Sequence, residues 1–116
     1  LELFLYYSSD IFTANWTPHP ANPIVSDIRN ARPAGKIFIH NNKIYRPSQD
    51  CSGLYGKAYN VNQITNLSET SFEEVLILRK EADWDSRLKG THTFNFDKDM
   101  LVVDAFTIEK RFHKAS

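Results

Sequence analysis

The sequence has no excess of charge of either sign, because its 14 lysines and arginines balance 14 aspartates and glutamates. A domain that binds nucleic acid non-specifically usually carries a basic patch or stripe, and none is visible here. The single cysteine, Cys51, excludes an internal disulfide and a zinc site built from several cysteines. We therefore expect no nucleic-acid partner, no metal and no cofactor, and we interpret Cys51 as a small, buried or half-buried residue.

Glycine is also scarce, with residues only at positions 35, 53, 56 and 90. These four form no glycine-rich phosphate-binding loop. The sequence lacks a Gly-x-Ser-x-Gly elbow as well, which disfavours a Ser-His-Asp hydrolase.

Long apolar runs are absent too. The longest are Leu3–Tyr7 and Val75–Leu78, far below the roughly 20 residues that a membrane-spanning helix needs, so we expect no membrane span. The chain opens at Leu1 without an initiator methionine or a readable signal peptide, which suggests an excised fragment entering the middle of a strand. The compartment stays open, with the cytoplasm slightly favoured.

Short strands and turns are what the sequence does contain, and residues 36–40 and 43–46 are the clearest example. These two apolar runs flank Asn41-Asn42, a pair compatible with the positive φ angles of a tight hairpin turn. The second run leads into Arg46-Pro47-Ser48-Gln49-Asp50, where a guanidinium, an amide and a carboxylate follow within five residues. We interpret this tail as a cluster at a strand end, where an all-β scaffold presents its chemistry.

Further strands are predicted on both sides of this hairpin. Residues 3–8 read as a strand, and residues 12–34, with four prolines, as a long ordered loop. Residues 55–64 and 72–80 read as strands, although the second could also open a helix. A second hairpin is expected over 90–96 and 100–104, after which the chain ends in a short helix or a tail.

This pattern predicts an all-β, antiparallel fold. Residues 35–80 form one four-stranded meander, and residues 90–106 supply the first hairpin of the next. Four-stranded antiparallel units repeated at about 40 to 50 residues are typical of β-propeller blades.

Several runs in a fixed order resemble one known family. They are Trp16–Ile24 (WTPHPANPI), Ala31–Gly35 (ARPAG), Tyr45–Ser52 (YRPSQDCS) followed by Tyr55-Gly56, and Gly90–Asn95 (GTHTFN). The chain resembles, over residues 1–106, the five-bladed β-propeller domain related to family 43 and family 32 glycosidases. It is most similar to the subgroup found with glucosamine inositolphosphorylceramide transferases and with bacterial formyltransferase-like proteins of surface-glycan pathways. The resemblance implies a fragment of about two blades, and residues 1–116 would be a partial propeller domain.

The chain departs from the glycosidase pattern at one important place. Active propeller glycosidases present carboxylates where the innermost strands begin, whereas this chain has Arg32-Pro33-Ala34-Gly35 there. A guanidinium cannot act as general acid, base or nucleophile near neutral pH, and glycoside hydrolysis normally needs two carboxyl groups. Arginines such as Arg32 and Arg46 suit a carboxylate or phosphate instead.

We therefore predict the carbohydrate-recognition part of a glycan-assembly protein, transferase-like, that binds an acidic or phosphorylated sugar. The alternatives are a fragment of a propeller-type glycoside hydrolase and a non-catalytic assembly element that forms oligomers through exposed blade edges. Whether the parent is an enzyme stays open. The candidate ligand-binding residues are Arg32, Arg46, Gln49, Asp50, Tyr55 and His92.

Each candidate also has a purely structural explanation. The Arg46–Asp50 cluster could bind a ligand or form an internal ion pair that ties a loop together. His92 could face a central channel or be a satisfied structural histidine. Tyr55 could stack on a sugar ring or pack in the core.

Overall fold

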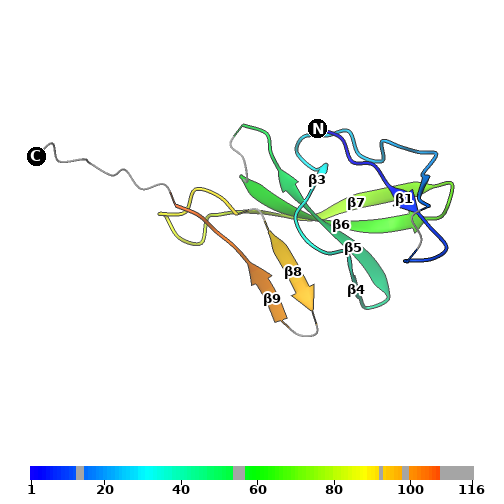
Figure 1. Ribbon diagram of the computed structural model, residues 1–116. Coiled ribbons are helices and arrows are strands. Elements are labelled where there is room, and N and C mark those ends of the chain that lie inside the picture. Colours follow the sequence, from blue (N-terminus) through cyan, green and yellow to red (C-terminus); the bar gives the residue numbers. More distant parts are fainter. Residues whose placement is uncertain (13–14, 54–56, 92, 98–99, 108–116) are drawn as a thin grey trace, which may run out of the picture.

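A computed structural model of the chain describes residues 1–12, 15–53, 57–91, 93–97 and 100–107. Within these ranges the protein is all-β with antiparallel pairing and no helix, and thus none that could cross a membrane. Three sheets are present: β1–β2, β8–β9, and a five-stranded sheet in which β3 and β4 both pair with β5, followed by β6 and β7 (Figure 1). The strands are β1 (Tyr6–Tyr7), β2 (Thr17–Pro18), β3 (Arg32–Pro33), β4 (Phe38–His40), β5 (Lys43–Asp50), β6 (Ala58–Leu67), β7 (Phe72–Glu81), β8 (Phe94–Asp97) and β9 (Met100–Val103).

The antiparallel all-β class agrees with the sequence prediction. A propeller blade is not seen as such, because the described sheets are open and separate. The predicted strand over 3–8 shrinks to β1, and the long loop over 12–34 contains only the two-residue strands β2 and β3.

The predicted hairpin turn is confirmed. Asn41 and Asn42 have φ angles of 49° and 62°, the left-handed conformation that joins β4 to β5 in a tight two-residue turn. The Arg46–Asp50 tail, however, does not follow a strand as we expected, because β5 continues to Asp50. Pro47 has no N–H to donate to a neighbouring strand. It is tolerated in β5 because the pairing with β4 stops at Tyr45 and the pairing with β3 begins only at Ser48.

The other predicted strands are present with shifted ends. β6 begins at Ala58 rather than at residue 55, and residues 54–56 lie outside the described part. Residues 72–81 are a strand, so the helical alternative is wrong. A β-bulge interrupts the β6–β7 register at Ile77, because Val61 pairs with Leu78 and the next residue, Asn62, pairs with Leu76.

The apolar core lies on one face of the five-stranded sheet. Tyr59, Val61 and Phe94 are buried there, with partly buried aromatic rings from Phe38, Tyr45 and Phe96 packed around them. The β8–β9 hairpin supplies Phe94 and Phe96 and lies beside this sheet (Figure 1). Its approach is close: a Cβ on Gly35 would lie 2.1 Å from the Phe94 carbonyl oxygen, so only glycine fits there.

The N-terminal segment is fastened to the sheet by a buried histidine. His19 accepts a hydrogen bond at Nδ1 from the Ala21 N–H (3.0 Å), which leaves Nε2 to donate to the Ser68 carbonyl in the β6–β7 turn (2.8 Å). The side chain is 2% exposed. This anchor holds the proline-rich loop in place, and the end of that loop covers the second face of the sheet.

Candidate functional site

The second face of the sheet is polar although most of it is buried. Strand register places alternate residues of β5, β6 and β7 on this face, because directly paired residues project to the same side. The polar residues of this face are Arg46, Ser48, Asp50, Asn60, Asn62, Glu74, Arg79 and Glu81. We call this set the polar face. Buried polar side chains cost free energy unless they are paired, so their partners decide what the face can do.

Arg46 and Glu74 form the most buried ion pair of the polar face. The Arg46 guanidinium donates to the Glu74 carboxylate through Nε (2.8 Å) and Nη2 (2.6 Å), and Nη2 also donates to the Asn30 carbonyl (3.0 Å). The two side chains are only 5% and 10% exposed. Two bonds in this geometry orient both groups, so Arg46 is held by the fold.

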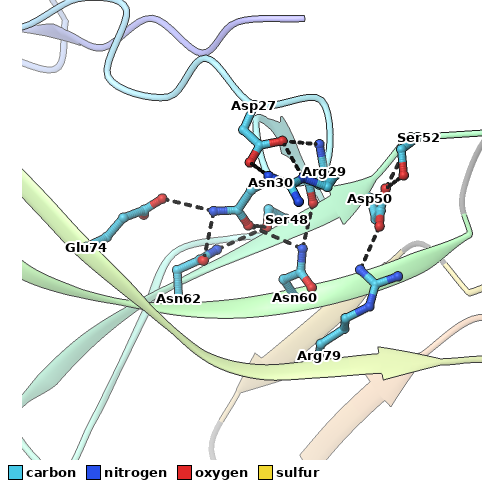
Figure 2. A network of polar contacts seen from close by, with 10 residues as sticks. All are labelled: Asp27, Arg29, Asn30, Ser48, Asp50, Ser52, Asn60, Asn62, Glu74 and Arg79. Carbon is cyan, nitrogen blue, oxygen red and sulfur yellow. Dashed lines mark hydrogen bonds and ion pairs between the residues drawn. The ribbon is translucent and has the colours of Figure 1, made fainter.

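Asn30, from the loop before β3, is the centre of a hydrogen-bond network with the sheet (Figure 2). Its Nδ2 donates to Asn62 Oδ1 (3.0 Å) and to Glu74 (3.4 Å). Its Oδ1 accepts hydrogen bonds from the Ser48 hydroxyl and from Asn60 Nδ2. The Asn30 side chain therefore fixes the loop over the polar face, because it forms hydrogen bonds with residues of β5, β6 and β7.

Asp50 lies near the other end of the polar face. Its carboxylate accepts hydrogen bonds from Arg79 Nη1 (2.7 Å) and from the backbone N–H (2.8 Å) and hydroxyl of Ser52. Burial by itself would raise the pKa of Asp50, but the Ser52 hydrogen bonds and the Arg79 hydrogen bond and charge outweigh it and lower the pKa. Asp50 is thus a buried, ionised acceptor.

A cleft of about 540 Å³ opens between the loop and this end of the polar face. Its lining is mostly charged and polar: Asp27, Arg29, Asn30, Asp50, Ser52, Lys57, Asn60, Leu76 and Arg79.

The ionic groups of the cleft differ in how far they are satisfied. Arg29 forms a two-pronged pair with Asp27 (3.0 and 2.9 Å), and this hydrogen bonding lowers the pKa of Asp27. Arg79 is shared between Asp50 and Glu81. Lys57 is exposed and makes no ion pair with any residue that the structure describes.

Two buried polar atoms of the polar face have no hydrogen-bond partner among the described residues. They are Asn60 Oδ1 and Arg46 Nη1, in residues that are, backbone included, 3% and 4% exposed. Asn60 lines the cleft, where its Nδ2 donates to the Arg29 carbonyl (2.7 Å). Asn60 Oδ1 is shielded from solvent, so a bound molecule would reach this acceptor only if the Asn60 side chain moved toward the cleft.

The structure places the predicted site residues in different surroundings. Arg46 and Asp50 share the polar face, whereas Gln49 is on the opposite side of β5, where its Nε2 donates to the Pro33 carbonyl (3.0 Å). Arg32 is exposed and paired in register with Gln49. Tyr55 and His92 lie outside the described residues.

Sequence reasoning missed Asn30, Asn60, Asn62 and Arg79. The available signal was the alternation of polar residues in β5 and β6, Arg46-x-Ser48-x-Asp50 and Asn60-x-Asn62, which marks one polar side of a sheet. Asn30 carried no such signal, because a loop residue has no periodicity.

Metal binding and cysteine chemistry do not stand out in the part of the chain that is described. No group of three or more His, Cys, Asp or Glu side chains there could hold a metal ion. Cys51 is free and partly buried.

Comparisons with known proteins place this chain in a family. Residues 1–108 match the family described as "Glucosamine inositolphosphorylceramide transferase 1, N-terminal". The protein of that name from Arabidopsis thaliana is 38% identical over 110 residues, and the match covers 90% of this chain and 14% of the relative. The one from Oryza sativa subsp. japonica is 37% identical over 76 residues, which covers 64% of this chain and 10% of the relative.

The chain thus spans a small part of the curated relatives that it matches. No solved structure matches it. The family match extends over all of the residues that the structure describes, including the polar face and its cleft. This chain belongs to the glucosamine inositolphosphorylceramide transferase 1, N-terminal, family.

Proposed function

We propose that this chain is the carbohydrate-recognition part of a glycan-assembly transferase and that its cleft binds an acidic or phosphorylated sugar. Family membership supports the transferase context. The relatives are named glucosamine inositolphosphorylceramide transferases. A ligand containing an inositol phosphate would combine a ring of hydroxyl groups with a negative charge, and the cleft offers partners for both.

The observation that carries this proposal is that the cleft combines acceptors, Asp50 and Asn60, with Lys57, which has no ion-pair partner among the described residues. Asp50 stands in the cleft as an ionised acceptor for sugar hydroxyls, and Asn60 Oδ1 is buried in the cleft wall, where a shift of its side chain would supply a second acceptor. Lys57 can bind a phosphate or carboxylate without first giving up a partner in the described part of the chain. A cleft with a few convergent polar groups is the usual form of a small-ligand site.

The residues predicted from the sequence enter this proposal in different ways. Asp50 contacts the ligand. Arg46 does not, because its buried guanidinium is bonded to Glu74 and to the Asn30 carbonyl, and it helps to position Asn30 beside the cleft. Arg32, Gln49, Tyr55 and His92 remain candidates for a more extended ligand.

Recognition is better supported than hydrolysis. A general acid needs a raised pKa, but the two carboxylates of the cleft have partners that lower it: Arg29 for Asp27, and Ser52 with Arg79 for Asp50. A propeller-type glycoside hydrolase would therefore have to take its acid from elsewhere.

We also infer that β4–β7 form one blade of a five-bladed propeller and that β8–β9 begin the next. The antiparallel order of β4 through β7 and the position of β8 against the apolar face of that sheet support this inference. The cleft would then lie on the polar side of a blade.

The test is titration calorimetry of the chain with myo-inositol 1-phosphate, glucosamine 6-phosphate and the two unphosphorylated compounds. We expect the phosphorylated ligands to bind more tightly, and Lys57→Gln to remove most of that preference, with about a tenfold loss for one charge-assisted contact. Neutral ligands should bind Lys57→Gln and the wild type equally.

Lys43→Gln is the matched control, because Lys43 is an exposed lysine at the start of β5, outside the cleft lining. Equal phosphate binding by the wild type and Lys57→Gln, or equal losses in both variants, would contradict the proposal.

A further inference from the structure

Strand β7 lies at one edge of the five-stranded sheet, opposite the edge formed by β3 and β4. Among the described residues it pairs with β6 only, so one side of its backbone is unpaired over ten residues. Its central residues Val75–Leu78 are apolar, yet each is between 45% and 56% exposed. An exposed apolar edge strand is a template for pairing with another strand.

The bulge at Ile77 gives β7 an unusual arrangement of side chains. In a regular strand, residues 75 and 78 would point to opposite faces. Here Val75 pairs with Gln63 and Leu78 pairs with Val61, and these two partners are two residues apart on β6. Val75 and Leu78 therefore lie on the same face.

The same face carries opposite charges at the two ends of β7. Glu73 precedes Val75 by two residues, and Lys80, which pairs with Tyr59, follows Leu78 by two. The row therefore reads Glu73, Val75, Leu78, Lys80. A second copy of this row in antiparallel orientation presents Lys80, Leu78, Val75 and Glu73 in turn. The row is therefore complementary to a second copy of itself.

We propose that β7 is a self-association surface that binds β7 of a second copy of this chain in antiparallel orientation. Pairing centred between Leu76 and Ile77 sets Glu73 opposite Lys80 of the second copy and Val75 opposite its Leu78. By two-fold symmetry both contacts occur twice. Opposite charges and apolar pairs directly across a strand pair are the favourable combinations.

The surroundings of β7 fit this partner. Glu73 is exposed. The Lys80 ammonium group donates a hydrogen bond to Asp83 (2.7 Å) and lies 5.7 Å from the centre of the Trp84 ring, and its other N–H groups can donate to a second carboxylate. An apolar groove of about 290 Å³ beside the row is lined by Ile77, Leu78 and Leu101, so association would also cover this groove.

The test uses charge reversal at the two ends of the row in the 116-residue chain. Glu73→Lys alone would set lysines opposite each other, and Lys80→Glu alone would set glutamates opposite each other. Each should raise the dimer dissociation constant about tenfold or more in sedimentation velocity, because two attractive pairs become repulsive. An equimolar mixture of the two variants should dimerise again, because both cross-pairs of that heterodimer join opposite charges.

Glu69→Lys is the matched control, since Glu69 is exposed in the turn before β7 and lies outside the row. Far-UV circular dichroism checks that every variant keeps its fold. A wild-type chain that stays monomeric at every accessible concentration would overturn the proposal. So would a dimer that ignores both reversals, a mixture that fails to restore association, or a dimer that Leu101→Lys in β9 disrupts while Glu73→Lys does not.

Discussion

The two faces of the five-stranded sheet are built from the same strands but are stabilised by different means. The apolar face buries ring surface, with Phe38, Tyr45, Tyr59 and Phe94 in stacked or tilted contact at centroid distances of 5.2 to 5.7 Å. The polar face buries amides and charges, which must be bonded one by one.

The two faces therefore differ in role: the apolar face serves mainly stability, and the polar face carries the cleft proposed to bind a ligand. Apolar contacts are non-directional and leave no unsatisfied atom behind, so the apolar face stabilises the domain without offering specific chemistry. The polar face leaves Asn60 Oδ1, in the wall of the cleft, without a hydrogen-bond partner among the described residues, and the proposed ligand would bind at this cleft. Substitutions on one face at a time should show how much each face contributes to the free energy of unfolding.

The largest effect is expected on the apolar face from Phe94→Ala. Phe94 is 7% exposed and is stacked with Phe38 and tilted against Tyr59, so its loss should destabilise the chain by about 3–5 kcal/mol in urea unfolding. Met100→Ala, at a position 68% exposed, is the control and should change stability little. A loss under about 1 kcal/mol for Phe94→Ala would mean that β8 does not close the core.

On the polar face, Glu74→Gln should cost about 3 kcal/mol, because it leaves the buried Arg46 charge without its counter-charge. The double variant Arg46→Met, Glu74→Leu removes both charges and should be closer to the wild type than Glu74→Gln is. Urea unfolding of the three proteins gives the comparison. If the double variant were the least stable, the pair would be contributing net stability rather than setting the position of the loop.

A smaller loss is expected from Asn62→Ala. Asn62 is fully buried and bonds the Arg46 carbonyl, the Ser48 hydroxyl and Asn30, so about 1–3 kcal/mol should be lost as these partners become unsatisfied. Asn66→Ala, on the exposed end of β6, provides the comparison and should stay within about 0.5 kcal/mol of the wild type. Similar losses for the two variants would argue against a fixed network.

The smallest effect should be a pH dependence from Asp50. Its pKa is lowered in the folded chain, so the stabilisation by its charged form is complete above the ordinary carboxyl pKa and is lost as the pH falls through the lower folded value. The stability difference between the wild type and Asp50→Asn should therefore be constant near neutral pH and narrow below about pH 4. A difference that widened on acidification would mean that the folded state favours the protonated acid.

The sequence by itself determined much of the local structure. Alternating residues and β-formers determined the strands, the Asn41-Asn42 pair determined a left-handed turn, and the prolines kept residues 12–34 out of a helix. These features depend on neighbours in the chain, so a pattern can reveal them. Arg46 and Asp50 were predicted in one cluster at the end of a strand, whereas both lie inside β5, which continues to Asp50.

Only the tertiary structure decided which side chains meet. Arg46 finds Glu74 at a separation of 28 residues, Asp50 finds Arg79 at 29, and Asn30 joins three strands from a loop without periodicity. The bulge at Ile77, which brings Val75 and Leu78 onto one face, likewise depends on how β7 pairs with β6. Strand periodicity shows which residues share a side of one strand, but pairing register and loop position fix their partners, because those depend on contacts between distant parts of the chain.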